Sequence, residues 1–257
     1  MCISVLKAII LAGGYAKRMW PLTKDFPKTL LPIGGKPAID HILDRLQEID
    51  VNAIIISTNL KFKPRFKAWL KEKHIGPIEI VAESSRREDE KLGAVGALAQ
   101  LAQTLKPDDY LIIAGDNLFT AGIRGMIGFY KEKKAPVVAV IKARSTDEVL
   151  RGSSVLLEKD MRIARFKEKP MKVETMLIGA CIYILPHKTL VRTSEYIQQG
   201  GDRDEPGNFM EWLCKRETVY GYMLPGRLWD IGTIEGYEEL KREFQAASLK
   251  DRDSSRT

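Results

Sequence analysis

The sequence is poor in residues that build covalent or metal cross-links. It contains three cysteines and three histidines in 257 residues, and Cys2, Cys181 and Cys214 lie far apart. Their odd number and wide spacing exclude a disulfide framework and a cysteine-rich metal centre, and they predict free thiols in a reducing cytoplasm. The chain also lacks any run of 18 apolar residues, so no membrane-spanning helix is predicted.

A basic stripe interleaved with aromatic residues is missing too. The formal net charge is +7, but lysine and arginine are scattered and often stand beside acidic residues, as at 87–91 and 131–135. Nucleic-acid-binding surfaces gather basic and aromatic side chains on one face, so we expect no nucleic-acid partner. The excess positive charge suits small phosphorylated substrates. The apolar N-terminus has no preceding basic region and is interpreted as a strand, not a signal peptide.

What the sequence does contain is an alternation of strand and helix patterns through residues 1–141. Short apolar runs predict buried strands at 7–11, 53–56, 78–81, 110–114 and 137–141. Helical spacing of apolar residues predicts helices from Pro37 to about 49 and over 64–73, 93–105 and 123–133. This alternation predicts an α/β fold, a Rossmann-like three-layer α/β/α domain with a mixed, mainly parallel central sheet.

The regular alternation of strand and helix patterns ends after residue 141. The patterns predict a small two-stranded β excursion at 155–157 and 162–166, strands at 177–185 and 218–223, and helices from 186, over 209–215 and over 233–247. No linker or internal repeat divides the chain. We therefore predict a single domain, residues 1–247, with an N-terminal half (1–141) and a C-terminal half (142–247), followed by a polar tail (248–257) that frays.

The first predicted strand ends in a glycine pair, Gly13 and Gly14. Adjacent glycines let the backbone turn sharply and present bare N–H groups to an anion. Arg18 and Lys28 follow, and both side chains are phosphate ligands. Prolines at 21, 27 and 32 stiffen the loop that carries them. The loop fits neither the P-loop nor the GxGxxG pattern, yet its composition predicts a nucleotide-binding loop.

The motifs within residues 11–32 together resemble the signature of the sugar nucleotidylyltransferases, which join a sugar 1-phosphate to a nucleoside triphosphate. They consist of LAGG at 11–14, then Arg18, PLT at 21–23, PK at 27–28 and LP at 31–32. The resemblance implies that the glycine loop wraps the nucleotide, that Arg18 holds the leaving pyrophosphate and that Lys28 lies on the phosphates. It also implies a nucleotide-binding half at 1–141 and a sugar-phosphate-binding half at 142–247.

Five further segments resemble that family in the same order. They are LGAVGAL at 92–98, GDN at 115–117, KEKP at 167–170, IGACIY at 178–183 and WDIGT at 229–233. The resemblance implies the following site residues: catalytic Arg18, Lys28 and Asp116; nucleotide-binding Leu11, Ala12, Gly13, Gly14, Arg18, Lys28, Glu83 and Gly93; sugar-phosphate-binding Gly152, Glu168, Lys169 and Gly179; and magnesium-binding Asp116 and Asp230.

Elementary chemistry supports the same assignment for the two aspartates. Asp116 and Asp230 each end a predicted β-segment, and two converging carboxylates suit Mg²⁺, which binds few protein oxygens besides phosphate oxygens. The attacking sugar phosphate is already an anion, so catalysis requires alignment and electrostatic stabilisation rather than a base. Taken singly, each aspartate would be read as a turn former or a helix N-cap.

Several positions depart from the family pattern. Ala16 stands where a glycine is usual, which we expect to be tolerated only with a negative φ, and Lys17 adds a cation next to the triphosphate. The loop at 84–91 is long and charged. Glu83 replaces a base-reading glutamine, and an ionised carboxylate can only accept hydrogen bonds from the base. Arg151 stands for a sugar-contacting tyrosine, so base and sugar choice stay open.

The predicted function is nucleotidyl transfer from a nucleoside triphosphate to a sugar 1-phosphate, with Mg²⁺ as cofactor and TTP or UTP with glucose 1-phosphate as the first pair. One alternative is a catalytically silent subunit that binds nucleotide sugars and regulates a partner. Another is a nucleotidyltransferase that acts on a non-sugar phosphate such as phosphocholine. The intact set of Arg18, Lys28, Asp116 and Asp230 favours the enzyme. Assembly into a homo-oligomer is left open.

Overall fold

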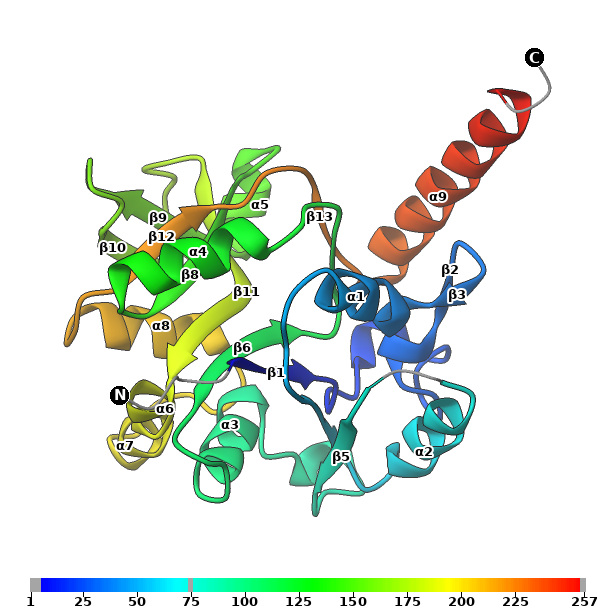
Figure 1. Ribbon diagram of the computed structural model, residues 1–257, viewed down its shortest axis with the longest axis horizontal. Coiled ribbons are helices and arrows are strands. Elements are labelled where there is room, and N and C mark those ends of the chain that lie inside the picture. The colour runs from blue at the N-terminus through cyan, green and yellow to red at the C-terminus, as the bar shows by residue number, and fades with distance from the viewer. Residues whose placement is uncertain (1–5, 74–75, 255–257) are drawn as a thin grey trace.

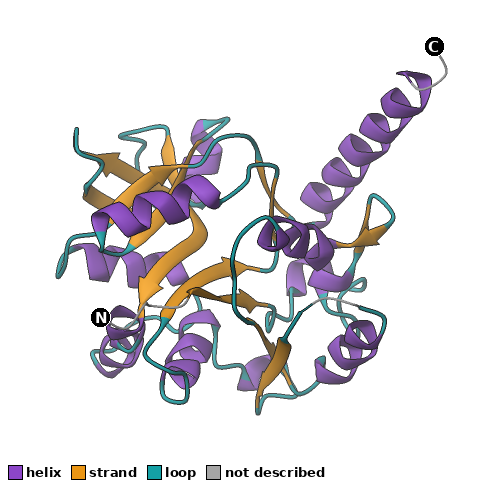
Figure 2. Ribbon diagram, viewed as in Figure 1, coloured by secondary structure: helices purple, strands orange, loops and turns teal. Residues whose placement is uncertain are grey.

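The computed structural model describes residues 6–73 and 76–254. Its centre is a seven-stranded sheet in the order β12-β8-β11-β6-β1-β4-β5. Figure 2 shows the strands in orange, with helices around them. The strands are β1 (Leu6–Leu11), β4 (Ile54–Asn59), β5 (Ile78–Glu83), β6 (Asp109–Ala114), β8 (Val137–Lys142), β11 (Leu177–Pro186) and β12 (Tyr220–Met223). Only β11 runs antiparallel to its neighbours in this sheet. The predicted mixed, mainly parallel sheet is therefore confirmed.

Helices cover both faces of the sheet (Figure 1). Residues of α1 (Ala38–Gln47), α2 (Lys63–Lys71), α4 (Arg124–Lys133) and α5 (Thr146–Arg151) pack in one core with Ala8 and Ile10. Residues of α3 (Ala94–Ala102), α6 (His187–Leu190), α7 (Arg192–Gln198) and α8 (Pro206–Cys214) pack in a second core with Ile9. Successive side chains of a strand point to opposite faces, so one apolar run supplies both cores.

Three two-stranded ribbons complete the fold. The predicted excursion is β9 (Ser153–Leu157) with β10 (Ile163–Glu168). The pairing of two further ribbons was not predicted: β2 (Pro32–Ile33) with β3 (Lys36–Pro37), and β7 (Asn117–Phe119) with β13 (Leu228–Asp230), although a β-segment ending at Asp230 was expected. Strands of two or three residues are too short for an alternating pattern, so the sequence does not show which strand each pairs with.

The helices differ from the predicted ones mainly in the extent of α9, in the start of α8 and in one helix that was not predicted. The last helix, α9 (Ile234–Ser254), continues beyond residue 247, where a frayed tail was expected; no glycine or proline stops it after Gly236. Helix α8 begins at Pro206 rather than 209, and α5 was missed although Ser145 caps it through its hydroxyl. The predictions for Cys2 and for residues 255–257 concern parts of the chain outside the described residues. None of the described helices is both long and apolar enough to cross a membrane.

Candidate active site

The predicted site residues gather at the edge where the parallel strands β1 and β6 end. Leu11 and Ala114 are register partners at that edge, and the antiparallel β11 begins there. The Gly115 amide donates to the Leu11 carbonyl (2.9 Å), and a Cβ at Gly115 would lie 2.8 Å from Thr29 Cγ2. Glycine is thus required for the loop that carries Lys28 to pass over the end of β6.

The glycine loop is anchored at its start and open beyond it. Ala12 donates its N–H to Ser57 (2.7 Å), and the Asn59 side chain donates to the Gly13 carbonyl (2.9 Å). Gly14 is exposed, with open space where a side chain would stand. Within the described part of the chain, no acceptor takes a hydrogen bond from the Gly13 or Gly14 amides. This arrangement leaves both amides able to face an anion, and their predicted contact with the nucleotide stays a prediction.

The expectation that Ala16 needs a negative φ is wrong. Ala16 has φ 47° and ψ 51°, in the left-handed region, directly before the short 3₁₀ helix η1 (Lys17–Met19). Its carbonyl accepts hydrogen bonds from the Thr23 hydroxyl and the Met19 amide, both 2.9 Å long. These two bonds hold a conformation that costs an alanine about 1–2 kcal/mol. The loop therefore keeps the glycine-like turn without the glycine.

Asp116 and Asp230 come together although 113 residues separate them along the chain. Asp230 in β13 is the register partner of Asn117 in β7, and the Ile231 amide donates to the Asp116 carbonyl (3.1 Å). Lys28, in the 3₁₀ helix η2 (Lys28–Leu30), forms an ion pair with the Asp116 carboxylate. The ribbon of β7 and β13 brings the two aspartates to one place, and Lys28 joins them from η2.

The charges at this centre are strongly coupled. Burial would raise the pKa of Asp116, but the Lys28 ammonium outweighs it and holds the pKa below its ordinary value. Burial, followed by the charge of Asp116, raises the pKa of Asp230, although Lys28 and Arg18 oppose this. A Cβ at Gly232 would lie 2.9 Å from Asp230 Oδ1 and 3.2 Å from Arg18 Nη2. The guanidinium therefore lies beside Asp230.

The paired carboxylates fit a hard divalent cation. Asp230 Oδ1 already accepts the Gly232 amide (2.7 Å), which fixes its orientation. Among the described residues, no group of three or more His, Cys, Asp or Glu side chains could hold a metal. Two carboxylates leave most of the coordination shell to water and phosphate oxygens, which is the preference of Mg²⁺. Asp116 and Asp230 are accordingly the residues that would hold it.

The predicted sugar-phosphate residues lie in three places: Gly152 between α5 and β9, Glu168 and Lys169 at the end of β10, and Gly179 on β11. Lys169 has φ 43°, and its amide donates to the Gly152 carbonyl (2.7 Å), so this turn joins two of the predicted residues. Gly179 packs against Phe166, whose Cε2 would lie 2.6 Å from a Cβ there. Burial, and then the charge of Glu205, raise the pKa of Glu168 to about 7. The positive charge of Arg18 opposes the rise in the pKa of Lys169, so the two cations lie in the same region of the site.

Glu83 and Gly93 contact other parts of the protein closely. Glu83 is 5% exposed, and its carboxylate accepts the Ser85 hydroxyl (2.7 Å) and the Leu92 amide (3.0 Å). It therefore anchors both ends of the charged loop. Gly93 has φ 79°, and a Cβ there would lie 2.3 Å from the Arg203 carbonyl oxygen. Their predicted contacts with the nucleotide stay predictions.

Two features that depart from the family pattern, Lys17 and the charged loop at 84–91, are joined by an ion pair. The Lys17 ammonium lies 2.5 Å from Glu88, in the 3₁₀ helix η3 (Glu88–Glu90) of the charged loop. Glu88 also pairs with Lys91 (3.2 Å), which pairs with Asp204 (2.6 Å). The added cation in the glycine loop is thus matched by an added anion in the loop opposite.

Sequence reasoning missed a set of residues around the start of α8. Glu205, Gly207 and Glu211 contact the Lys167–Lys169 turn directly. A signal was available, because Pro206 is a typical first helical residue and would have placed the helix start here. Their partners, about 40 residues earlier in the chain, leave no pattern in the sequence.

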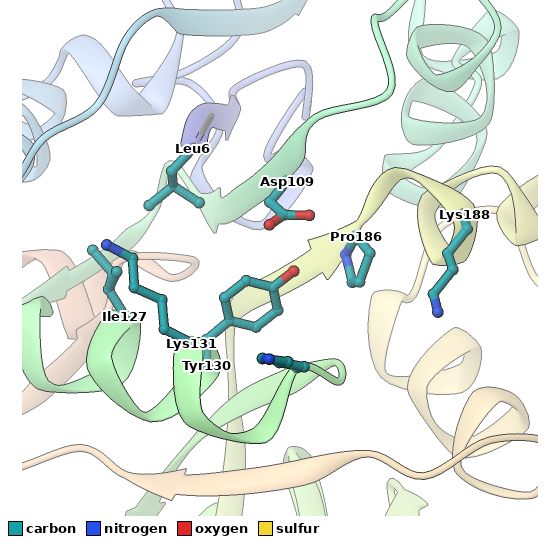
Figure 3. A pocket seen from close by; sticks show the side chains of 8 residues that line it. Leu6, Asp109, Ile127, Tyr130, Lys131, Pro186 and Lys188 are labelled. Carbon is teal, nitrogen blue, oxygen red and sulfur yellow. The ribbon is translucent and has the colours of Figure 1, made fainter. Parts of the chain in front are cut away.

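A separate cavity of about 360 Å³ lies at the opposite edge of the sheet, where β1 and β6 begin (Figure 3). Tyr130 and Lys131 of α4 reach it from one side, and Asp109 and Pro186 line the other. None of the predicted site residues lines it. The predicted site lies instead at the carboxyl edge, which is the usual ligand site of a parallel α/β sheet.

Comparison with known proteins agrees with this geometry. Residues 7–247 match the family model described as nucleotidyl transferase. A D-glycero-alpha-D-manno-heptose 1-phosphate guanylyltransferase of Aneurinibacillus thermoaerophilus is 25% identical over 93% of this chain and 99% of its own length. The bifunctional protein GlmU of Methanocaldococcus jannaschii is 29% identical over 88% of this chain, which spans 51% of that protein. A mannose-1-phosphate guanylyltransferase of Mycobacterium tuberculosis is 27% identical over 92% of this chain and 64% of its own length.

Solved structures show the same fold. A UDP-glucose pyrophosphorylase in complex with UDP-glucose superimposes with a TM-score of 0.79 at 21% identity, over 95% of this chain and 99% of that one. HddC from Yersinia pseudotuberculosis gives 0.71 at 21% identity, over 93% and 99%. The predicted α/β/α architecture is confirmed. Because the family match extends almost from end to end of the described residues, the chain belongs to the nucleotidyl transferase family of enzymes.

Proposed function

We propose that the chain transfers a nucleotidyl group from a nucleoside triphosphate to a sugar 1-phosphate. An oxygen of the sugar phosphate attacks the α-phosphorus, and the bond from that phosphorus to the bridging oxygen of the β-phosphate breaks. The products are a nucleoside diphosphate sugar and pyrophosphate. The main support is the convergence of Lys28, Asp116 and Asp230 beside Arg18, at the end of a glycine loop with free amides.

Each group has a role in this reaction that follows from its position. The Gly13 and Gly14 amides bind triphosphate oxygens, and Arg18 holds the leaving pyrophosphate. Lys28 stabilises negative charge that builds up around the α-phosphate. Mg²⁺ bound by Asp116 and Asp230 supplies further neutralisation of phosphate charge. The attacking oxygen carries a negative charge already, so no proton has to be removed.

The acceptor lies against the turn after β10. Lys169 binds the sugar phosphate, and Glu168 accepts hydrogen bonds from sugar hydroxyls. The Gly152 carbonyl accepts the Lys169 amide and Gly179 packs against Phe166, so these two glycines shape the wall against which the sugar lies. TTP or UTP with glucose 1-phosphate is the first pair to test. GTP belongs in the same trial, because two of the relatives are named guanylyltransferases. The free thiols Cys181 and Cys214 support our assignment to the cytoplasm.

The test is pyrophosphate release over a matrix of nucleoside triphosphates and sugar 1-phosphates with Mg²⁺. We expect one pair to react, and Lys28→Ala and Asp116→Asn to abolish the rate. Asp25→Asn, at a side chain that is 77% exposed, is the matched control and leaves the rate unchanged. Absence of turnover with every pair in a folded protein would contradict the proposal. Nucleotide-sugar binding without turnover would instead support the silent subunit, and turnover with phosphocholine alone would support the non-sugar acceptor.

A further inference from the structure

One short segment, residues 203–207, touches the binding motifs of both halves of the site. It follows α7 and runs into the first turn of α8. Its residues stand next to one another in the chain, yet their partners come from the 91–96 region on the nucleotide side and from the 168–169 turn on the acceptor side.

On the nucleotide side the segment caps helix α3. The Arg203 carbonyl accepts hydrogen bonds from the Val95 amide (2.8 Å) and the Gly96 amide (3.3 Å) in the first turn of that helix. Asp204 pairs with Lys91 at 2.6 Å. Because Gly93 has no side chain, the backbone of Arg203 can approach this helix start directly. Helix-start amides that would otherwise be unpaired are satisfied by the segment.

On the acceptor side the same segment contacts two of the four predicted sugar-phosphate residues, Glu168 and Lys169. Glu205 forms an ion pair with Lys169. Gly207 is buried against Glu168, and a Cβ at this glycine would lie 1.8 Å from Glu168 Oε2. One turn further along α8, Glu211 accepts the Glu168 amide (3.2 Å) and pairs with Lys167 (3.2 Å). Three consecutive residues of the turn, Lys167 to Lys169, are thus all contacted by residues of α8 or its cap.

We propose that the 203–207 segment is a positioning element that fixes Glu168 and Lys169 relative to the nucleotide-binding helix start. This inference rests on the proposed function of the site. Displacement at phosphorus depends on the alignment of two substrates, and a misplacement of about 1 Å costs roughly a hundredfold in rate. Pro206 restricts the backbone of the segment, so a displacement on one side is passed to the other.

Gly207→Ala is the decisive variant. The atom displaced is the end of a flexible glutamate side chain, so the fold persists while the Glu168 carboxylate is pushed out of its place. We expect the KM for the sugar 1-phosphate to rise about tenfold, with the KM for the nucleotide unchanged. Glu205→Gln keeps the shape but frees Lys169, and we expect a rise of about fivefold. Asn208→Ala, at the next helix position, is the matched control, since its side chain makes no hydrogen bond among the described residues.

Transmission across the segment is tested by Gly93→Ala. Its methyl group would displace the Arg203 backbone, so we expect the KM for the sugar 1-phosphate to rise although the substitution lies on the nucleotide side. If the wild type turns over and Gly207→Ala and Glu205→Gln both leave that KM within about twofold, the inference fails while the proposed function stands.

A second readout needs no activity. Carbon-13 NMR titration of the glutamate carboxyls should show the pKa of Glu168 falling from about 7 toward 4.5 in Gly207→Ala, because the carboxylate leaves its buried position. An unchanged titration in the folded variant would overturn the inference, whether or not any substrate pair reacts.

Discussion

Substitution of Glu168 by glutamine should make the unliganded protein more stable above neutral pH. The environment of Glu168 raises its pKa from 4.5 to about 7, because burial and the charge of Glu205 disfavour the carboxylate. A shift of about 2.5 units corresponds to roughly 3 kcal/mol of unfavourable free energy when the group is ionised. Glutamine has nearly the same shape and never ionises, so this cost is absent in Glu168→Gln.

The pH dependence follows from the direction of the shift. Between pH 4.5 and about 7 the folded wild type holds a proton that the unfolded chain has released. Wild-type stability therefore falls as the pH rises through this window, and the loss is complete above it. The advantage of Glu168→Gln should be below about 1 kcal/mol at pH 5 and approach roughly 3 kcal/mol at pH 8.

Thermal unfolding followed by circular dichroism measures this difference. For a chain of this length, roughly 3 kcal/mol corresponds to a rise in Tm of about 6–12 °C at pH 8. Glu132→Gln is the matched control, because the Glu132 side chain is 69% exposed, and its effect on Tm should not change with pH. An equal gain for Glu168→Gln at pH 5 and pH 8, or no gain at either, would refute the reasoning. The same variant should bind the sugar 1-phosphate less well, since it loses an acceptor oxygen.

Three further predictions concern the glycine loop and the acidic pair. Ala16→Gly should raise the Tm by about 1–2 °C, because relief of the left-handed conformation slightly exceeds the entropy cost of glycine; a lower Tm would contradict this. Lys28→Met should destabilise the protein by about 2–4 kcal/mol in EDTA, since Asp116 loses its counter-ion, and Mg²⁺ should restore part of that stability. Equal stability of the variant and the wild type in denaturant titrations would contradict the ion pair of Lys28 with Asp116. A double-mutant cycle of Lys17→Ala and Glu88→Ala should give a coupling of about 0.5 kcal/mol that vanishes in high salt, and a salt-independent coupling would be inconsistent with an exposed ion pair.

Much of the fold and of the candidate site could be predicted before the structure. The apolar runs at 7–11, 53–56 and 110–114 became β1, β4 and β6, because buried strands need continuous apolar residues whatever they pair with. The glycine pair and the order of the motifs pointed to the nucleotide loop. The convergence of Asp116 with Asp230 was expected, and the structure shows it.

The parts that could not be predicted depend on partners distant in the sequence. Nothing local requires Ala16 to be left-handed; the Thr23 and Met19 bonds to its carbonyl hold it there. Glu83 was expected to read the base, and only the folded loop shows that its carboxylate already accepts from Ser85 and Leu92.

The sequence by itself determined the alternation of strands and helices, the glycine loop and the identity of the charged residues, because each of these depends on local spacing and residue chemistry. Only the tertiary structure decided how the acceptor side is held. The three-residue strands β7 and β13, and the contacts of α8 with the Lys167–Lys169 turn, have no periodicity of their own. Such elements gain their stability from the surface on which they pack, so their placement exists only once the rest of the chain has folded.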